Sequence, residues 1–237
     1  MAPASRLTSI TAYENQSKYF STITNNLTNA QTPGFKRDVP LFRPFLEQRM
    51  GLSSPYPLIS ETRTLFQQGD LHQTGNPFDL AIEGDGFFKL QTPHGIRYTR
   101  AGNFRLNEQG VLTHTDGFPV MGRNGEIVLK GRTVTVGKDG TVEVDGAQID
   151  QIAVAAFPDP GLLRKEGQNL FRVEDPRQEK KSEASQVHQG TLEASNVNPI
   201  EEMVKLIDSL RTYESCLKMI QSQDELDSRA ANDVGRV

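Results

Sequence analysis

The chain has 237 residues, of which 35% are hydrophobic and 24% charged, and its formal net charge is −4. This composition allows a sizeable buried core and predicts one or two domains. The slightly negative charge, without any run of five like charges, argues against nucleic acid and anionic membranes as partners. No apolar segment reaches transmembrane length, and residues 1–16 lack the apolar stretch of a cleavable signal, so we expect no membrane insertion.

Residues 5–30 carry apolar side chains mainly at steps of three, four or seven, which is the pattern of an amphipathic helix. These apolar positions are Leu7, Ile10, Tyr13, Phe20, Ile23, Leu27 and Ala30. The dipeptide Pro33-Gly34 is predicted to end the helix. The segment 38–68 that follows contains four prolines, so we expect an irregular or partly extended connector there.

The middle of the chain, from about residue 78 to residue 171, consists of short runs rich in β-branched and aromatic residues, which predict strands. Asp-Gly and Asn-Gly dipeptides separate these runs and suit tight hairpin turns. Aromatic residues in these strands are interpreted as core packing rather than a ligand platform. The sequence therefore predicts an antiparallel β domain.

A second long helix is predicted to begin near Asn198, because Asn can cap free backbone N–H groups and Pro199 suits the first helical position. Glu201 takes the capping-box position. Beyond it, apolar residues at steps of three and four predict a coiled-coil-like face that needs a partner helix. The residues of this face are Ile200, Met203, Leu206, Ile207, Leu210, Tyr213, Leu217 and Ile220.

Two segments of the chain resemble each other: QGDLHQTGNP at 68–77 and QGTLEASNVNP at 189–199. Only two copies occur and their flanks differ, so they do not indicate a repeat array. We interpret them as a matched pair of strands at the borders of the β region.

These patterns together predict an α+β fold, in which N- and C-terminal helices form a coiled-coil-like layer and the middle domain is mainly antiparallel β. We expect an N-terminal helical assembly segment at 1–35, a connector at 36–70, a β-rich middle domain at 71–194 and a C-terminal helical assembly segment at 195–237.

No catalytic, cofactor-binding or metal-binding residues are predicted. The glycines of EGDGFFKL lack the third glycine of a dinucleotide fingerprint and the lysine of a P-loop. The four histidines are scattered, without the spacing of a zinc site or a catalytic triad. The single cysteine, Cys216, excludes an intrachain disulfide and is interpreted as a packed thiol. The chain is therefore expected not to be an enzyme.

Four motifs, taken together, closely resemble the flagellar rod and hook protein family. They are NNLTNAQTPGFKR at 25–37, TGNPFDLAIEGDGFF at 74–88, YTRAGNF at 98–104 and QGTLEASNVNPIEEM at 189–203. This resemblance implies a structural subunit that leaves the cytoplasm unfolded through the flagellar type III export apparatus. It also implies helical polymerisation with copies of itself and with other rod proteins, in the basal-body rod that crosses the periplasm.

Within that family, segments 164–173 and 195–204 and the C-terminal ending resemble the larger proximal-rod protein more than the distal-rod protein, which is the next alternative. Ala12-Tyr13 departs from the family, whose members often have Gly-Met at this place. From another class, an adhesin or fibre-like binding module would share the β richness but would not need two terminal helices. A β-rich hydrolase is a further alternative, and the sequence offers no catalytic set for it.

Exposed amphipathic ends that cannot bury their apolar faces alone are expected to gain order when neighbouring subunits supply complementary helices. Pro33 and Gly34 are expected to redirect the chain outward from the helical layer. The asparagines near this bend are expected to cap or cross-link turns through their side-chain amides. The predicted assembly interface consists of Ile10, Phe20, Ile23, Asn25, Asn26, Leu27, Asn29, Ile200, Met203, Leu206, Ile207, Leu210, Tyr213, Leu217 and Ile220.

Overall fold

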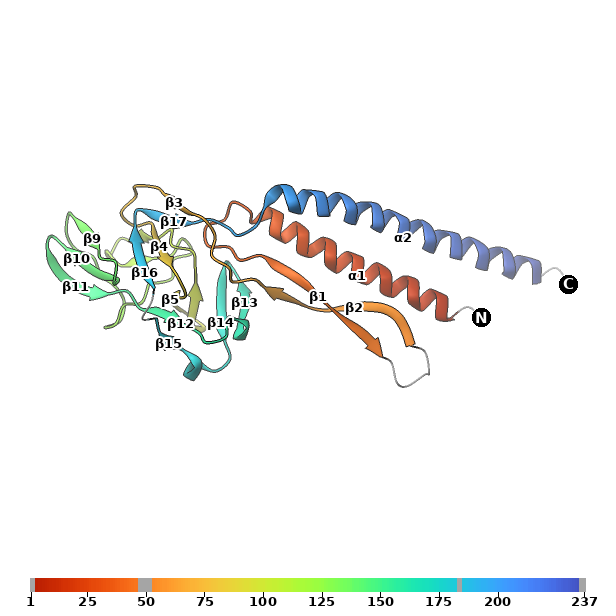
Figure 1. The fold of residues 1–237 in the computed structure, drawn as a ribbon, viewed down its shortest axis with the longest axis horizontal. Helices are drawn as coiled ribbons and strands as arrows, with labels where there is room; N and C mark the ends of the chain where they lie inside the picture. Colours follow the sequence, from red (N-terminus) through yellow and green to blue (C-terminus); the bar gives the residue numbers. More distant parts are fainter. Residues whose placement is uncertain (1–2, 47–52, 183–184, 235–237) are drawn as a thin grey trace. The chain divides into compact units, whose positions relative to one another are not determined.

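The computed structural model describes residues 3–46, 53–182 and 185–234 (Figure 1). The chain divides into two compact units. The terminal unit comprises Met1–Thr28, Asp38–Arg63 and Val197–Val237, and the β unit comprises Asn29–Arg37 and Thr64–Asn196.

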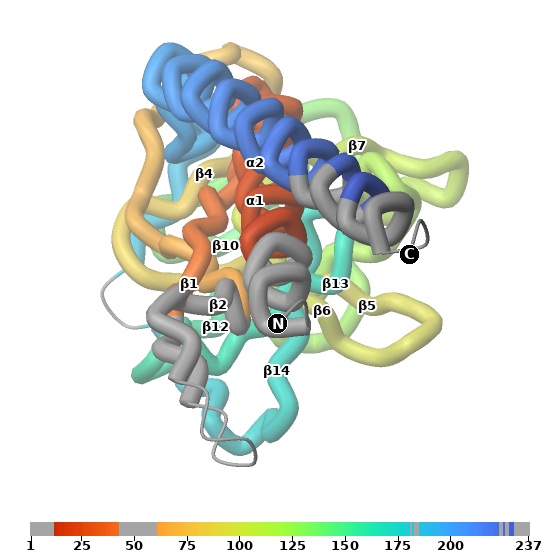
Figure 2. Tube along the Cα trace, turned by 90° about the vertical axis from the view of Figure 1, so that its right-hand side faces the viewer, coloured from red at the N-terminus to blue at the C-terminus, as the bar shows by residue number. Residues whose placement is uncertain are grey.

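Two long helices, α1 (Pro3–Thr28) and α2 (Pro199–Val234), form most of the terminal unit. They lie side by side in both views (Figure 1 and Figure 2). Contacts run from the end of α1 to the start of α2 and from the middle of α1 toward the middle of α2, so the pair is antiparallel. The helix predicted for residues 5–30 is therefore present with slightly different bounds.

The remaining part of the terminal unit is a pair of strands, β1 (Asp38–Leu46) and β2 (Ser53–Thr64). The four prolines of segment 38–68 predict an irregular or partly extended connector. The structure places strands β1 and β2 over most of this segment. Within each strand the two prolines are an even number of positions apart, so their nitrogens point to one side of the strand. In a two-stranded sheet one side of each strand is unpaired, and proline on that side removes no ladder hydrogen bond.

The β unit is built from short strands, and the pairings between its described strands are antiparallel. One sheet has the order β13-β14-β6-β5-β12-β15, a second has the order β11-β10-β9, and β16-β4, β17-β3 and β7-β8 form pairs. The bounds are β3 (Leu71–Gln73), β4 (Leu80–Glu83), β5 (Phe87–Thr92), β6 (Gly95–Thr99), β7 (Arg105–Leu106), β8 (Leu112–Thr113), β9 (Val134–Val136), β10 (Thr141–Val144), β11 (Ala147–Gln151), β12 (Val154–Ala156), β13 (Leu163–Gly167), β14 (Leu170–Val173), β15 (Lys180–Lys181), β16 (Gln186–Gln189) and β17 (Thr191–Glu193).

Short turns make these pairings possible. Asp145 and Gly146 join β10 to β11 with φ of 52° and 84°, which is the conformation of a two-residue type I′ hairpin turn. Aspartate tolerates this left-handed backbone region better than most residues, and glycine adopts it freely. The prediction that Asp-Gly dipeptides join strands is confirmed at this turn.

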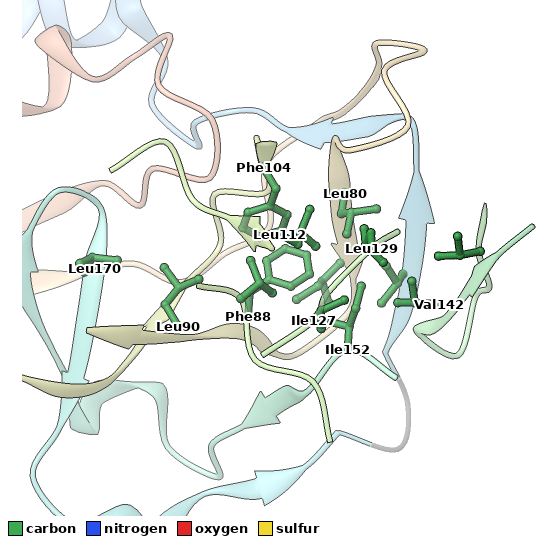
Figure 3. Packing of buried hydrophobic residues seen from close by; sticks show 14 residues of the cluster. Leu80, Phe88, Leu90, Phe104, Leu112, Ile127, Leu129, Val142, Ile152 and Leu170 are labelled. Atoms are coloured by element: carbon green, nitrogen blue, oxygen red, sulfur yellow. The ribbon is translucent and has the colours of Figure 1, made fainter. Parts of the chain in front are cut away.

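Two clusters of buried apolar side chains form the core of the β unit. The larger one packs Leu80, Phe88, Phe104 and Ile127 among other aliphatic side chains (Figure 3). Phe88 and Phe104 meet edge to face, with ring centroids 5.0 Å apart, as aromatic pairs prefer. The smaller cluster comprises Phe87, Tyr98, Ala155, Phe157, Leu163 and Phe171. The strand aromatics therefore form core, as predicted.

The observed architecture is α+β with mainly antiparallel sheets. In the part of the chain that the structure describes, α-helix occurs only as α1 and α2, at the two ends of the sequence. None of the described helices is long and apolar enough to cross a membrane.

Candidate assembly site

Polar side chains form hydrogen bonds across the contact surface between α1 and α2 at three places along the helices. The Tyr13 and Tyr213 hydroxyls are 3.0 Å apart, with ring centroids at 5.3 Å. Gln16 donates through Nε2 to the carbonyl oxygen and the hydroxyl of Ser209, at 2.9 and 2.8 Å. Because a hydrogen-bonding pair is satisfied only when its members lie opposite each other, these contacts fix how far one helix can slide along the other.

The third polar contact of this surface involves Asn26, which is 2% exposed. Its Nδ2 atom donates to the Glu202 carboxylate at 3.2 Å and to the Asp38 carbonyl oxygen at 2.8 Å. Its Oδ1 atom accepts from the Asp38 N–H at 2.9 Å. One side chain thus joins the end of α1 to the first turn of α2 and to the start of β1.

The first turn of α2 is capped as the sequence predicts. Asn198 accepts through Oδ1 from the N–H groups of Ile200 and Glu201, at 3.1 and 3.3 Å, and Pro199 is the first helical residue. Glu202 is 2% exposed, and Lys205 donates to it at 3.0 Å. Acidic residues in a first helical turn are also favoured by the helix dipole.

Two faces of α2 differ in what covers them. The face toward α1 contains Glu202 and Ser209, each 2% exposed. Leu206, which lies between them in the sequence, and Tyr213, which follows Ser209, are half-buried on the same face. The other face is apolar and exposed, and we call it the outer face. Its residues, with their exposed fractions, are Ile200 (74%), Met203 (50%), Val204 (55%), Ile207 (51%) and Leu210 (41%).

The structure therefore distributes the predicted interface residues over different environments. Ile23 is buried against its own chain, like Asn26, while Asn25 is exposed on α1. Asn29 lies in the β unit, and the side chain of Ile10 lies outside the described residues. The predicted interface residues that are half-buried in the terminal unit are Phe20, Leu27, Leu206, Tyr213, Leu217 and Ile220.

The family-like motifs meet in the β unit at one buried group of charges, which we call the charge node: Lys36, Arg100 and Glu193. Glu193 is 1% exposed and accepts through Oε1 from Lys36 Nζ at 2.5 Å and through Oε2 from Arg100 Nη1 at 3.2 Å. The N–H of Gly69 donates to Oε1 at 3.0 Å. The sequence patterns did not predict this node, although each charged residue lies in one of the family-like motifs.

Burial and neighbouring charges act in opposite directions on these groups. Burial lowers the pKa of the Lys36 ammonium, and the Glu193 carboxylate opposes this effect. Burial likewise lowers the pKa of the Arg100 guanidinium, which stacks over the Phe87 ring at 5.2 Å. Lys36 also donates to the Gln67 carbonyl oxygen, and Arg100 to those of Ile82 and Gly84. The cations are therefore held by hydrogen bonds as well as by charge.

Gly34 lies beside this node with a φ of 67°, half-way between the end of α1 and the start of β1. A Cβ atom at this place would lie 2.3 Å from the carbonyl carbon of Arg100 and 2.4 Å from the Ala101 nitrogen. Only glycine combines this backbone conformation with such a close approach. The half-buried Pro33 accepts through its carbonyl oxygen from Asn169 Nδ2 at 2.8 Å.

The two segments that resemble each other pair with one another. β3 and β17 are antiparallel, with Thr191 opposite Gln73 and Glu193 opposite Leu71. The interpretation as a matched pair of strands is confirmed. The pairing sets Glu193 beside the segment that contains Gly69, so the strands help to position the carboxylate of the node.

The described part of the β unit also contains one polar hollow. This hollow of about 210 Å³ is lined partly by Lys89, Arg123, Gln151 and Glu179, but Lys89 already donates to Glu179 at 2.8 Å. Among the described residues, no cluster of three or more histidine, cysteine or acidic side chains could hold a metal ion.

Comparisons with known proteins show that the chain is similar to flagellar rod and hook proteins. A profile described as "Flagellar basal body rod FlgEFG protein C-terminal" matches residues 188–233, and one described as "Flagellar hook protein FlgE/F/G D1 domain" matches residues 81–144. The chain is 38% identical over 225 residues to the flagellar basal-body rod protein FlgF of Caulobacter vibrioides, covering 91% of each chain.

A relative named FlgG and a further relative named FlgF are similar over a comparable extent. The flagellar basal-body rod protein FlgG of Bacillus subtilis is 31% identical over 251 residues, covering 92% of this chain and 94% of the relative. FlgF of Salmonella typhimurium is 31% identical over 222 residues, covering 87% of this chain and 88% of the relative.

Proposed function

Since the chain belongs to the flagellar basal-body rod protein family, a family of structural proteins, we propose that it polymerises helically through its terminal helices to build the rod. The rod is the axial drive shaft of flagellar motility. The partners are other copies of this chain and other rod proteins. The rod position in the periplasm, reached through the type III export apparatus, is part of the same proposal.

The outer face of α2 is the observation that carries this proposal. One face of α2 is covered by α1 of the same chain, but Ile200, Met203 and Ile207 are each at least half exposed on the outer face. Contiguous exposed apolar surface of this kind marks interaction sites in soluble proteins. Helices from neighbouring copies cover it in a coiled-coil-like layer, because apolar residues at steps of three and four suit helix packing.

The geometry of a rod follows from how such a face is used. If the outer face of one copy binds a different surface of the next copy, the contact is heterologous and need not close into a ring. A non-closing heterologous contact produces a helical filament. The helix pair then forms the inner layer of the rod, and the β unit contributes outer bulk and contacts specific to this subunit.

Placement in the proximal rod is the finer part of the proposal. It is supported by the resemblance of segments 164–173 and 195–204 to the larger proximal-rod protein, with distal placement as the alternative. The relatives carry the names FlgF and FlgG and leave the two placements open. Locating a labelled subunit and its neighbours in isolated basal bodies decides between them.

Ile207→Asp tests assembly through the outer face. We expect this variant to stop rod assembly and motility while its circular dichroism and β-unit protection stay unchanged, because the charge enters an exposed face of the folded monomer. Thr212→Asp is the matched control, since Thr212 is exposed on the same helix outside this face. Normal assembly of both Ile207→Asp and Met203→Asp would contradict the proposal.

A further inference from the structure

The last segment of the β unit, residues 186–196, binds to parts of the chain that precede it by more than one hundred residues. β16 pairs with β4 and places Val187, which is 2% exposed, in the larger core cluster. β17 pairs with β3, and the Ala194 N–H donates to the Asp70 carbonyl oxygen at 2.8 Å. This segment therefore completes two pairs of strands and part of the core.

The same segment also secures the chain around Lys36. The Gly34 N–H donates to the Glu193 carbonyl oxygen at 2.7 Å, and the Arg37 N–H donates to Asn196 Oδ1 at 2.7 Å. Asn196 Nδ2 in turn donates to the carbonyl oxygens of Leu65 and Gln67, at 2.8 and 3.0 Å. Two separate parts of the chain, residues 34–37 and 65–67, thus depend on residues 193–196 for these hydrogen bonds.

The buried charges of the charge node make the β unit depend strongly on Glu193. The charge node contains two buried cations, Lys36 and Arg100, and Glu193 is the carboxylate that bonds both. Asp85 also attracts Arg100, but Asp85 is exposed to solvent. Without residue 193, a folded β unit would hold two buried cations without their buried anion, which is among the costliest arrangements in a protein interior.

We propose that residues 186–196 are a closing segment: the β unit cannot complete its core until they join, so the β unit stays unfolded until they have been made. Synthesis proceeds from the N-terminus, and the closing segment is the last part of the β unit to appear. This delay leaves the β unit unfolded and therefore able to pass through the export apparatus. The benefit to export rests on the proposed function, whereas the order of folding does not.

Pulsed hydrogen exchange during refolding of the full-length chain tests the order directly. We expect the amides of β4–β6 and those of β16–β17 to become protected in one kinetic phase. A separate, earlier phase that protects β4–β6, with β16–β17 following later, would overturn the proposal. Because this measurement needs no rod, its failure is distinguishable from a failure of the outer face in assembly.

Two substitutions at the charge node are expected to destabilise the β unit to different extents. Glu193→Gln leaves two uncompensated cations and should lower the ratio of folded to unfolded β unit by about a hundredfold or more. Lys36→Met leaves Arg100 paired with Glu193 and should lower the ratio by no more than about tenfold. If Glu193→Gln fails to fold while Lys36→Met folds, the proposal is supported. Equal losses in both variants would overturn it.

Discussion

The Nδ2 atom of Asn26 in α1 donates a hydrogen bond to the Glu202 carboxylate in α2 over 3.2 Å, and both side chains are 2% exposed. A buried carboxylate is tolerated only when its oxygens are bonded, and here Lys205 is a second donor. A polar contact of this kind specifies how two helices align, whereas apolar contacts alone allow neighbouring registers. The contact therefore gives the helix pair one defined arrangement.

Asn26→Ala should destabilise the helix pair by about 1–3 kcal/mol, because it removes a donor from buried Glu202 and both hydrogen bonds to the Asp38 backbone. Hydrogen exchange of the α1 amides measures the change. Ser21→Ala, at an exposed position of the same helix, is the control and should change the free energy by less than about 0.5 kcal/mol. Equal effects of the two substitutions would show that the hydrogen bonds of Asn26 do not stabilise the helix pair.

Gly34→Ala should destabilise the β unit far more than Gly75→Ala. Both glycines have a left-handed backbone, with φ of 67° and 77°, so both variants carry a strain of about 1–2 kcal/mol. At Gly34 the added Cβ also meets the Arg100 backbone at 2.3 Å, while nothing lies within 4 Å of that place at Gly75. Denaturant unfolding should show a difference of at least about 2 kcal/mol, and similar values for both would contradict the close approach.

Much of the fold could be predicted from local patterns. The terminal helices follow from apolar spacing, and Asn198 with Pro199 marks the start of α2 because capping is a local interaction. The β1–β2 pair was harder to predict, because prolines weaken a strand pattern unless their nitrogens all face an unpaired side. That condition depends on the partner strand, which the sequence does not reveal.

The candidate site was predictable only in part. Apolar spacing places Leu206 and Ile207 in one stripe, but the structure half-buries the first and exposes the second, since neighbouring positions on a helix point 100° apart. Glu202 and Ser209 face α1 although neither is apolar. The charge node joins residues far apart in sequence, so no local pattern could have revealed it.

Acid should destabilise the β unit through His114, which is 4% exposed and whose Nδ1 atom lies 3.0 Å from Asp116 Oδ2. Burial lowers the pKa of this imidazole from its ordinary value of 6.5, and this effect outweighs the opposing charge of Asp116. As pH falls through 6.5, the unfolded chain takes up a proton that the folded chain does not. Stability should therefore decrease between pH 7.5 and 5.5, by at most about 1.4 kcal/mol per pH unit.

The slope of stability against pH isolates this histidine. In His114→Gln the side chain stays neutral at every pH, so the denaturation midpoint should depend less on pH between 7.5 and 5.5 than in the unmodified chain. His72→Gln, at an exposed position, is the control and should keep the original slope. An unchanged slope in His114→Gln would show that other groups cause the acid sensitivity.

In a verified monomer, α1 and α2 should lose protection together and before the core of the β unit. Among the described residues of the terminal unit, the buried apolar side chains are Ile23 and Val197, whereas the β unit contains two large apolar clusters. Local stability follows the amount of buried apolar contact, so the helix pair should open at lower free energy. Limited proteolysis and native-state hydrogen exchange measure the order of opening.

A variant of the α1–α2 contact distinguishes joint from independent opening. Gln16→Ala removes both bonds to Ser209, so it should speed exchange in α2 as much as in α1 and leave β5 and β6 unaffected. Ser17→Ala, at an exposed neighbouring position, should change neither helix. Faster exchange confined to α1 would mean that the helices are not stabilised by each other, and the outer face of α2 would then lack the support that assembly requires.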